Sequence, residues 1–217
     1  MAHSVKIVTL GDAGTGKSAL IQRYIEGTFA PGASTIGVQF IAKRLQIGDT
    51  SLALAIWDPC GQERYRSLVK LYYQGASVAL ICYDITLADS FEQAQYWVDN
   101  INNHNTENCM KYLVGTKLDL VEDGEFERAV PAIRVTKYAE EIGAVAMETS
   151  SKTGFNIDEL FARLSSDYIE SDQIPKARDG STICLDARDN LDDVKKTRKR
   201  CTQCSGRRQP NTTVTQL

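Results

Sequence analysis

Long apolar runs are what this sequence of 217 residues most plainly lacks. No stretch approaches the roughly 18 uninterrupted apolar residues of a membrane-spanning helix, so we expect none. The first six residues lack the apolar core of a signal peptide. The six cysteines have no framework spacing, which predicts reduced thiols and a cytosolic protein. The apolar content of 42% suits a globular domain and excludes a disordered chain.

The charge is unevenly distributed along the chain. Residues 1–175 carry 15 basic and 23 acidic side chains, whereas residues 176–217 carry 10 basic and 5 acidic ones. Aromatic residues and any apolar period also stop at this point, which predicts one domain followed by a flexible basic tail. Such a tail suits weak contact with an anionic membrane leaflet. We expect no nucleic-acid partner, because the acidic body would repel a polyanion.

Two periodicities alternate over the first 170 residues. Apolar residues at helical spacing predict helices over 91–101 and 156–169, with Asn156 and Glu159 as a capping box. The strands expected are 5–10, 78–84, 111–116 and 144–148, and a hairpin of 39–47 with 52–58 across Gly48-Asp49. This order predicts an α/β fold with a mostly parallel six-stranded sheet, helices on both faces and one antiparallel edge.

A phosphate-binding loop follows the first expected strand. Residues 11–18, Gly-Asp-Ala-Gly-Thr-Gly-Lys-Ser, fit the pattern G-x-x-x-x-G-K-[ST] between a strand and a helix. Glycines let backbone N–H groups surround phosphate oxygens, and the helix N-terminus adds partial positive charge. Lys17 would reach the β- and γ-phosphates, and the Ser18 hydroxyl is a hard ligand for Mg²⁺. The residues predicted to bind phosphate are Gly11, Asp12, Ala13, Gly14, Thr15, Gly16, Lys17, Ser18 and Ala19.

Three later segments, each at a strand end, favour guanine and a third phosphate. Asp58, at a strand end, is expected to be a partner of the groups that bind the Mg²⁺, and Gly61 can present its N–H to a γ-phosphate. Asp119 can accept hydrogen bonds from N1–H and the 2-amine of guanine, whereas N1 of adenine is an acceptor, which argues against a P-loop kinase. A tight loop over 148–152 could donate a backbone N–H to the guanine carbonyl. The residues predicted to bind the base are Thr116, Lys117, Asp119, Ser150, Ser151 and Lys152.

Together these segments resemble a Ras-superfamily small GTPase, a P-loop NTPase, over about residues 5–170, and within that superfamily a Rab. The Rab likeness rests on residues 34–40, 62–68, 71–76 and 148–154. The resemblance implies a G domain over 1–175 that binds GTP or GDP with Mg²⁺. It also implies a switch that hydrolyses GTP slowly and regulates vesicle traffic, cytoplasmic or peripheral on the cytosolic face of endomembranes.

The resemblance also assigns roles to the residues of the switch loops. Thr35 would bind Mg²⁺ and the γ-phosphate, and Phe29 would lie edge-on to the base. Gln62 would orient the attacking water, while an activating protein supplies an arginine. The implied catalytic set is Gln62, Gly61 and Thr35.

Partner binding is also implied at these loops. An exchange factor, an activating protein and effectors would bind there, and we expect a monomer. Phe40, Trp57 and Tyr72 match the apolar triad against which Rab effectors pack, although such aromatics could also be plain core residues.

The sequence departs from the family pattern in several places. Thr116 stands where most relatives have asparagine, so a base contact and a brace to the phosphate loop should weaken. Pro59-Cys60 replaces the usual Thr-Ala, which leaves a GTP-binding scaffold that has lost hydrolysis as the alternative function. Cys201 and Cys204 are followed by thirteen residues, whereas Rabs end with cysteines for prenylation, so we expect no prenyl group.

Overall fold

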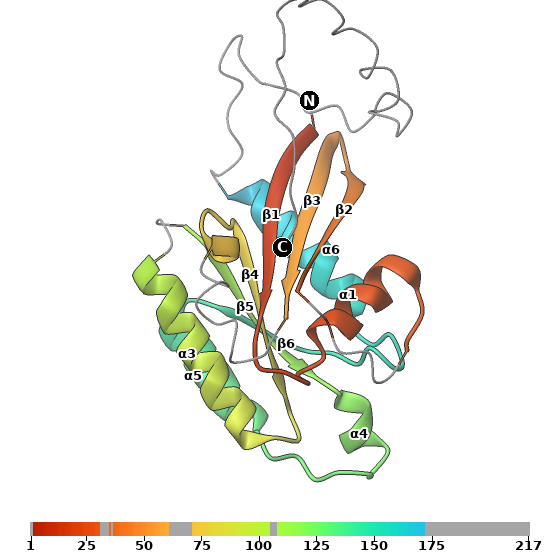
Figure 1. Cartoon of the computed structure of the whole chain (residues 1–217), viewed down its shortest axis with the longest axis vertical. Helices are drawn as coiled ribbons and strands as arrows, with labels where there is room; N and C mark the ends of the chain where they lie inside the picture. The colour runs from red at the N-terminus through yellow and green to blue at the C-terminus, as the bar shows by residue number, and fades with distance from the viewer. Residues whose placement is uncertain (1, 31–34, 36, 61–70, 105–107, 172–217) are drawn as a thin grey trace, which may run out of the picture. The chain divides into compact units, whose positions relative to one another are not determined.

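Strands and helices alternate along the chain in a computed structural model that describes residues 2–30, 35, 37–60, 71–104 and 108–171. The elements are β1 (Ala2–Leu10), α1 (Lys17–Glu26), β2 (Val38–Ile47), β3 (Thr50–Pro59), β4 (Val78–Asp84), α3 (Ala88–His104), β5 (Met110–Thr116), α4 (Leu118–Glu122), α5 (Ala132–Ile142), β6 (Val145–Glu148) and α6 (Ile157–Glu170). The six strands form one sheet in the order β2-β3-β1-β4-β5-β6 (Figure 1). Only the β2–β3 pair is antiparallel, which confirms the predicted α/β class.

Each face of the sheet carries its own apolar core. Successive residues of β4 alternate between the two cores, and all seven are buried, which explains the uninterrupted apolar run in the sequence. On one face α3 contacts α5 through Phe91 and Tyr138, whose ring centroids lie 5.9 Å apart. On the other face Tyr24 of α1 stacks on Phe161 of α6 at 3.6 Å. Helices therefore cover both faces, as predicted.

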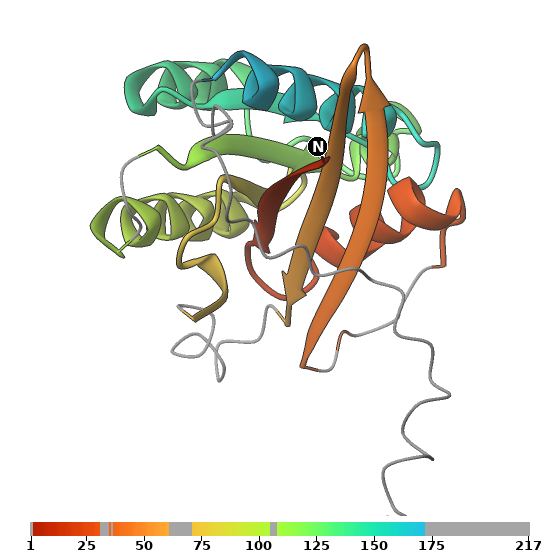
Figure 2. The same ribbon diagram turned by 90° about the horizontal axis from the view of Figure 1, so that it is seen from above.

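The antiparallel edge is a hairpin longer than the sequence pattern suggested. Its pairing extends from Ile47 opposite Thr50 to Val38 opposite Pro59, and Figure 2 shows β2 and β3 running side by side. The turn passes through Gly48, whose φ of 55° favours glycine. This register places Phe40 directly beside Trp57.

Asn156 does not form the predicted capping box. Its backbone is left-handed, with a φ of 57°, and its side chain makes no hydrogen bond to the helix start. The amide instead donates to the carbonyl oxygen of Glu148 at 2.9 Å, which ties the start of α6 to the end of β6. The side-chain amide thus donates to a carbonyl eight residues away, and the side-chain oxygen does not accept a backbone N–H of the helix as a cap would.

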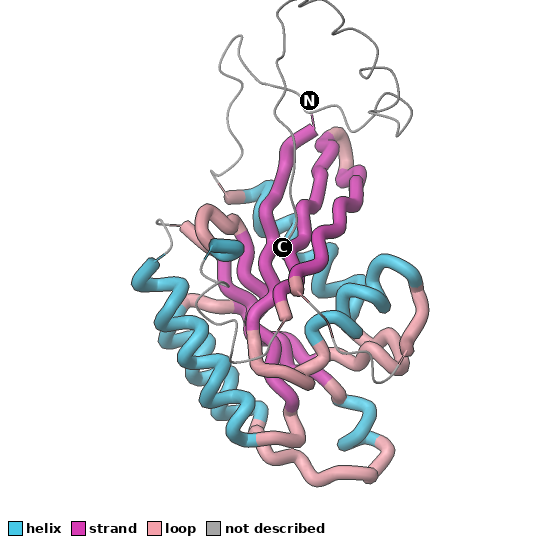
Figure 3. The backbone as a smooth tube through the Cα atoms, viewed as in Figure 1, coloured by secondary structure: helices cyan, strands magenta, loops and turns pink. Residues whose placement is uncertain are grey.

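The loops that follow the parallel strands gather at one end of the sheet (Figure 3). Parallel strands bring their carboxyl ends to the same edge, which is where α/β sheets bind ligands. No helix in the described part of the chain has the length and apolar character needed to cross a bilayer. The predicted tail, residues 176–217, lies outside the described residues, so the domain boundary stays a prediction.

Candidate functional site

The loop between β1 and α1 requires glycine at specific positions. Gly11 has a φ of 138°, and a Cβ atom there would lie 2.3 Å from the carbonyl oxygen of Cys82. Gly14 and Gly16 have φ values of 78° and 80°, which side-chain-bearing residues rarely adopt. The motif therefore marks a backbone path that other residues cannot follow without strain.

Lys17 is held by the loop that it follows. Its ammonium donates to the carbonyl oxygens of Gly11 at 3.0 Å and Asp12 at 2.6 Å. Burial lowers the pKa of Lys17, while the nearby Cys82 and Asp58 act in the opposite direction. Lys17 is only 5% exposed, so its ammonium group is held within the loop and is shielded from bulk solvent.

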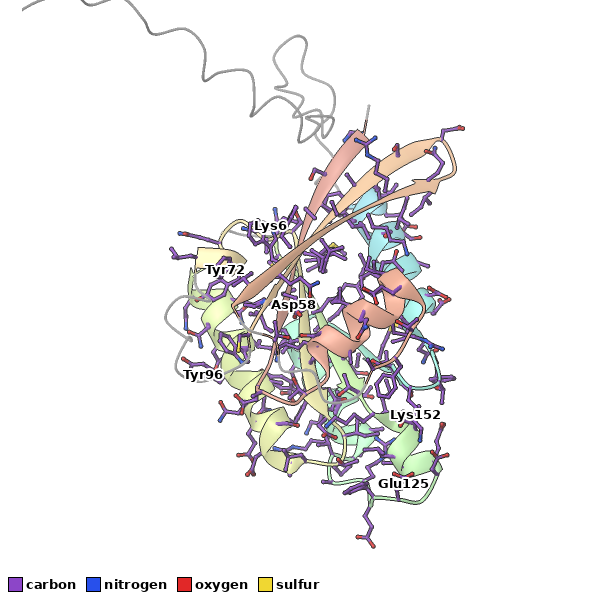
Figure 4. All side chains as sticks on the ribbon, turned by 45° about the vertical axis from the view of Figure 1, so that its right-hand side comes forward. Lys6, Asp58, Tyr72, Tyr96, Glu125 and Lys152 are labelled. Atoms are coloured by element: carbon purple, nitrogen blue, oxygen red, sulfur yellow. The ribbon has the colours of Figure 1, made fainter. Side chains whose placement is uncertain are left out.

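The three residues predicted for the magnesium site converge. Ser18 donates to Asp58 Oδ2 at 2.5 Å, and its hydroxyl also shares a hydrogen bond with that of Thr35. Asp58 is fully buried beside α1 (Figure 4). Thr9, which the sequence reasoning missed inside an apolar strand, donates to Asp58 Oδ1 at 2.5 Å and orients the carboxylate. Two hydroxyls and one carboxylate are hard oxygen donors, which fits Mg²⁺ bound by few protein ligands and by phosphates.

Asp119 and the loop after β6 form a second polar cluster. Asp119 is 5% exposed and accepts a hydrogen bond from the Ser150 hydroxyl at 2.5 Å. Lys152 Nζ lies 3.9 Å from Asp119 Oδ2 and 3.0 Å from Asp123 Oδ2. The hydrogen bond to Asp123 raises the pKa of Lys152 above its usual value. One Asp119 oxygen thus has a fixed donor, and the predicted base readers lie together.

The loop after β6 closes on itself. The Ser150 N–H donates to the Phe155 carbonyl at 3.1 Å, and the Gly154 N–H donates to the Ser150 carbonyl at 2.8 Å. The Thr153 N–H donates to the Ser150 hydroxyl at 3.1 Å. These bonds make the tight turn that the sequence analysis expected.

Thr116 braces the phosphate loop, although its replacement of asparagine predicted a weaker brace. Its hydroxyl lies 2.8 Å from the carbonyl oxygen of Thr15 and 2.9 Å from that of Tyr83. One hydroxyl hydrogen serves two acceptors, so the brace is present but shared. Thr116 is 1% exposed, so its hydroxyl cannot bond to bulk water in place of these two carbonyls.

We expect Thr116→Val to release GDP about fivefold faster than the natural protein, because a buried carbonyl of the phosphate loop loses its donor. Valine keeps the shape and removes only the hydroxyl. Release of a fluorescent GDP analogue measures the rate. Thr116→Ser, which keeps the hydroxyl, should stay close to the natural rate, and equal rates for valine and serine would show that the brace is idle.

Asp84 and Lys117 form an ion pair that sequence reasoning did not find. Lys117 Nζ lies 2.6 Å from Asp84 Oδ2, and Thr86 donates its N–H to Asp84 Oδ1 at 2.9 Å. Lys117 has a φ of 64°, a strained conformation that turns the chain from β5 into α4. The pair therefore holds the residue two positions before Asp119.

The predicted aromatic triad is contiguous. Ring centroids of Phe40 and Trp57 lie 4.9 Å apart, and those of Trp57 and Tyr72 lie 5.8 Å apart. Phe40 is 54% exposed, so it is no core residue, whereas Trp57 is half-buried and packs partly on the core. Lys6 Nζ lies 5.7 Å from the Trp57 ring, and Figure 4 shows Lys6 and Tyr72 on the same side of the ribbon.

The structure leaves the roles of three other predicted site residues, Gly61, Gln62 and Phe29, as predictions. Gly61 and Gln62 lie outside the described residues, so their roles stay predictions. Phe29 is 38% exposed, and its place against a base is also a prediction. Cys60 is buried, and its N–H donates to the Gly37 carbonyl at 2.8 Å, which joins the end of β3 to the start of β2.

Known proteins match most of this chain. The sequence model of the Ras family matches residues 6–170. The chain is 41% identical to Ras-related protein Rab5A of Oryza sativa subsp. japonica over 172 residues, 79% of this chain and 83% of that protein. It is 41% identical to Ras-related protein Rab-5A of Dictyostelium discoideum over 177 residues, 81% and 85% of the two chains. It is also 41% identical to Ras-related protein Rab-31 of Mus musculus over 164 residues, 75% and 82% of the two chains.

Proposed function

The chain belongs to the Ras family and is a Rab-like small GTPase, and on this premise we propose which residues carry its activity. Members of the family bind GTP or GDP with Mg²⁺, hydrolyse GTP and act as switches in membrane traffic, and this chain does the same. Guanine nucleotide, regulators and effectors are its partners in general terms. The finer assignment of residues rests on the geometry of the site.

The convergence of Ser18, Thr35 and Asp58 is the observation that carries the assignment. Ser18 and Thr35 would hold the Mg²⁺ through their hydroxyls, and the Asp58 carboxylate, oriented by Thr9, accepts a hydrogen bond from the Ser18 hydroxyl. When bound, the ion neutralises charge on the phosphates. Lys17 and the backbone of residues 11–19 bind the phosphates, because that loop combines fixed positive charge with a helix N-terminus.

We expect Ser18→Ala to lower Mg²⁺ affinity at least about tenfold, because one hard oxygen donor is lost. Chelation of Mg²⁺ should speed GDP release from the natural protein, whereas the variant should already release GDP fast and respond little to chelation. Release rates across a Mg²⁺ titration measure this. Ser171→Ala is the matched control, because Ser171 bonds only to the Tyr168 carbonyl at 2.7 Å among the contacts described for its side chain. A natural Mg²⁺ response in Ser18→Ala would contradict the assignment.

The base is read by Asp119 and by the loop from Ser150 to Lys152. Asp119 Oδ1 is occupied by Ser150, which orients the carboxylate for the N1–H and 2-amine of guanine. The backbone N–H groups of Ser151 and Lys152 serve the guanine carbonyl, because that of Ser150 donates within the loop. Gln62 orients the attacking water and Gly61 binds the γ-phosphate, while Pro59-Cys60 slows the step without abolishing it.

Effectors pack on the triad of Phe40, Trp57 and Tyr72. The three rings are contiguous, and one of them is more than half exposed, so an aromatic side chain of the kind enriched in hot spots is open to a partner. The protein works as a monomer on the cytosolic face of endomembranes in this proposal. Exchange factors and activating proteins bind the same loops.

The basic tail gives weak, salt-sensitive membrane contact. Residues 195–200 place five cations in six positions, and Arg207-Arg208 add two more. Each is worth about 1 kcal/mol near an anionic leaflet at low salt. We expect binding to vesicles with 20% phosphatidylserine to fall at least about tenfold when salt rises from roughly 50 to 300 mM. Flotation measures it; a variant with these cations changed to glutamine is the control, and undiminished binding by that variant would contradict the proposal.

A further inference from the structure

Arg23, in the last turn of α1, joins two segments that lie 130 residues apart. Its Nη1 donates to the Gly27 carbonyl at 2.9 Å, and its Nη2 donates to the Thr153 carbonyl at 3.1 Å. A Cβ atom at Gly154 would lie 2.8 Å from Nη2, 3.1 Å from Nε and 3.4 Å from Cζ. The plane of the guanidinium therefore lies against Gly154, and no other residue type fits there without displacing it.

One of the two segments that Arg23 touches belongs to the proposed base site, and the other ends α1. Thr153 and Gly154 lie in the loop that also contains Ser150, which donates to Asp119. Gly27 is the left-handed residue that ends α1, with a φ of 70°, and its N–H donates to the Arg23 carbonyl at 3.0 Å. Arg23 thus bonds to both the N–H and the carbonyl of Gly27 at the end of α1. Its bond to Thr153 holds the base loop next to that end of the helix.

The choice of arginine has a physical reason. A guanidinium presents several N–H donors in one rigid plane, so it can bond two carbonyls at fixed separation, whereas a lysine ammonium is a point charge. A cation at a helix C-terminus is also favoured by the helix dipole. The loop from Ser150 to Phe155 closes through its own short bonds, but those bonds do not fix its position relative to α1.

We propose that Arg23 is a positioning residue for guanine recognition, which holds the loop of residues 150–155 where the backbone N–H groups of Ser151 and Lys152 meet the guanine carbonyl. This rests on the proposed role of that loop. Asp119 reads the opposite edge of the base, at N1–H and the 2-amine, and Arg23 does not touch it. Loss of Arg23 therefore weakens recognition of the carbonyl and leaves recognition of the 2-amine intact.

Three nucleotides separate these contacts. 6-Thio-GDP differs from GDP only in the carbonyl oxygen, replaced by sulfur, a weaker acceptor, and inosine diphosphate lacks only the 2-amine. Affinities of all three are measured on the full chain by competition. We expect Arg23→Ala to lower the ratio of GDP to 6-thio-GDP affinity at least about threefold, because the loop no longer favours oxygen. The ratio of GDP to inosine diphosphate affinity should stay within about twofold of the natural value.

Two further variants probe the same contact. Arg23→Lys keeps the charge without the planar fork. Gly154→Ala pushes the guanidinium away and also strains the loop backbone, because the φ of Gly154 is 88°. Both should lower the first ratio as Arg23→Ala does. Arg134→Ala, which removes a surface arginine 3.9 Å from Glu92, is the matched control and should leave both ratios unchanged.

The outcomes distinguish the inference from its premise. If the natural protein prefers GDP over 6-thio-GDP and all three variants keep that preference, Arg23 is only a structural residue and the inference is wrong. If the natural protein shows no such preference, the loop does not read the carbonyl, and the proposed role of residues 150–155 is wrong together with the inference. Equal loss in both ratios would also overturn it, because a general loosening of the site moves both.

Discussion

Asp119→Asn is expected to abolish the preference of this protein for GTP over xanthosine triphosphate, a change of at least about a hundredfold in the affinity ratio. A carboxylate accepts hydrogen bonds from the guanine N1–H and 2-amine, whereas an amide donates to the 2-oxo group of xanthine. Because Asp119 is buried, a mismatch between its side chain and the base is costly: the unpaired polar groups on the side chain and on the base cannot bond to water instead. Competition binding with both nucleotides measures the ratio.

The fold should tolerate this change. Asparagine keeps an oxygen that can accept the Ser150 hydroxyl, as Asp119 Oδ1 does at 2.5 Å. Asp123→Asn is the matched control, because Asp123 also pairs with Lys152, at 3.0 Å, but is 52% exposed at its side chain. A strong remaining preference for GTP in Asp119→Asn would show that Asp119 is not the base reader.

Gln62→Leu is expected to lower GTP turnover stimulated by an activating protein at least about a hundredfold. Leucine keeps most of the volume and removes the amide that orients the attacking water. Nucleotide affinity should change little, because the assigned binding residues lie elsewhere. Single-turnover phosphate release measures the step, with GDP affinity measured in parallel.

The neighbouring pair Pro59-Cys60 gives the contrasting variant. Cys60 is buried, and Pro59 removes a backbone donor one residue earlier. Replacement by Thr-Ala should leave turnover equal or faster, because volume is removed and a donor is restored. Clear slowing would contradict the view that the pair hinders hydrolysis, and unchanged turnover in Gln62→Leu would remove Gln62 from the mechanism.

The sequence alone determined the class of the fold and predicted the chemistry of the site. Periods of two and 3.6 residues are local, so the strands and the helices α3 and α6 could be placed within a few residues of their observed bounds, whereas α4 and α5 were not predicted. The phosphate loop is contiguous, and its glycines report a backbone path that Gly11 confirms by its approach to Cys82. Asp58 and Asp119 were found because parallel strands end at the same edge, where a single acidic residue stands out.

Only the tertiary structure decided which residues support that site. Thr9 bonds to Asp58, Thr116 bonds to Thr15 across 101 residues, and Arg23 bonds to Thr153. In the sequence these residues are an ordinary strand threonine, an apparent loss of a brace and a surface arginine. Their roles depend on the order of strands and the packing of α1 against α6, which sequence spacing does not encode. Asn156 shows the same limit, because its amide donates to the Glu148 carbonyl and its side chain does not form the local cap that its position predicted.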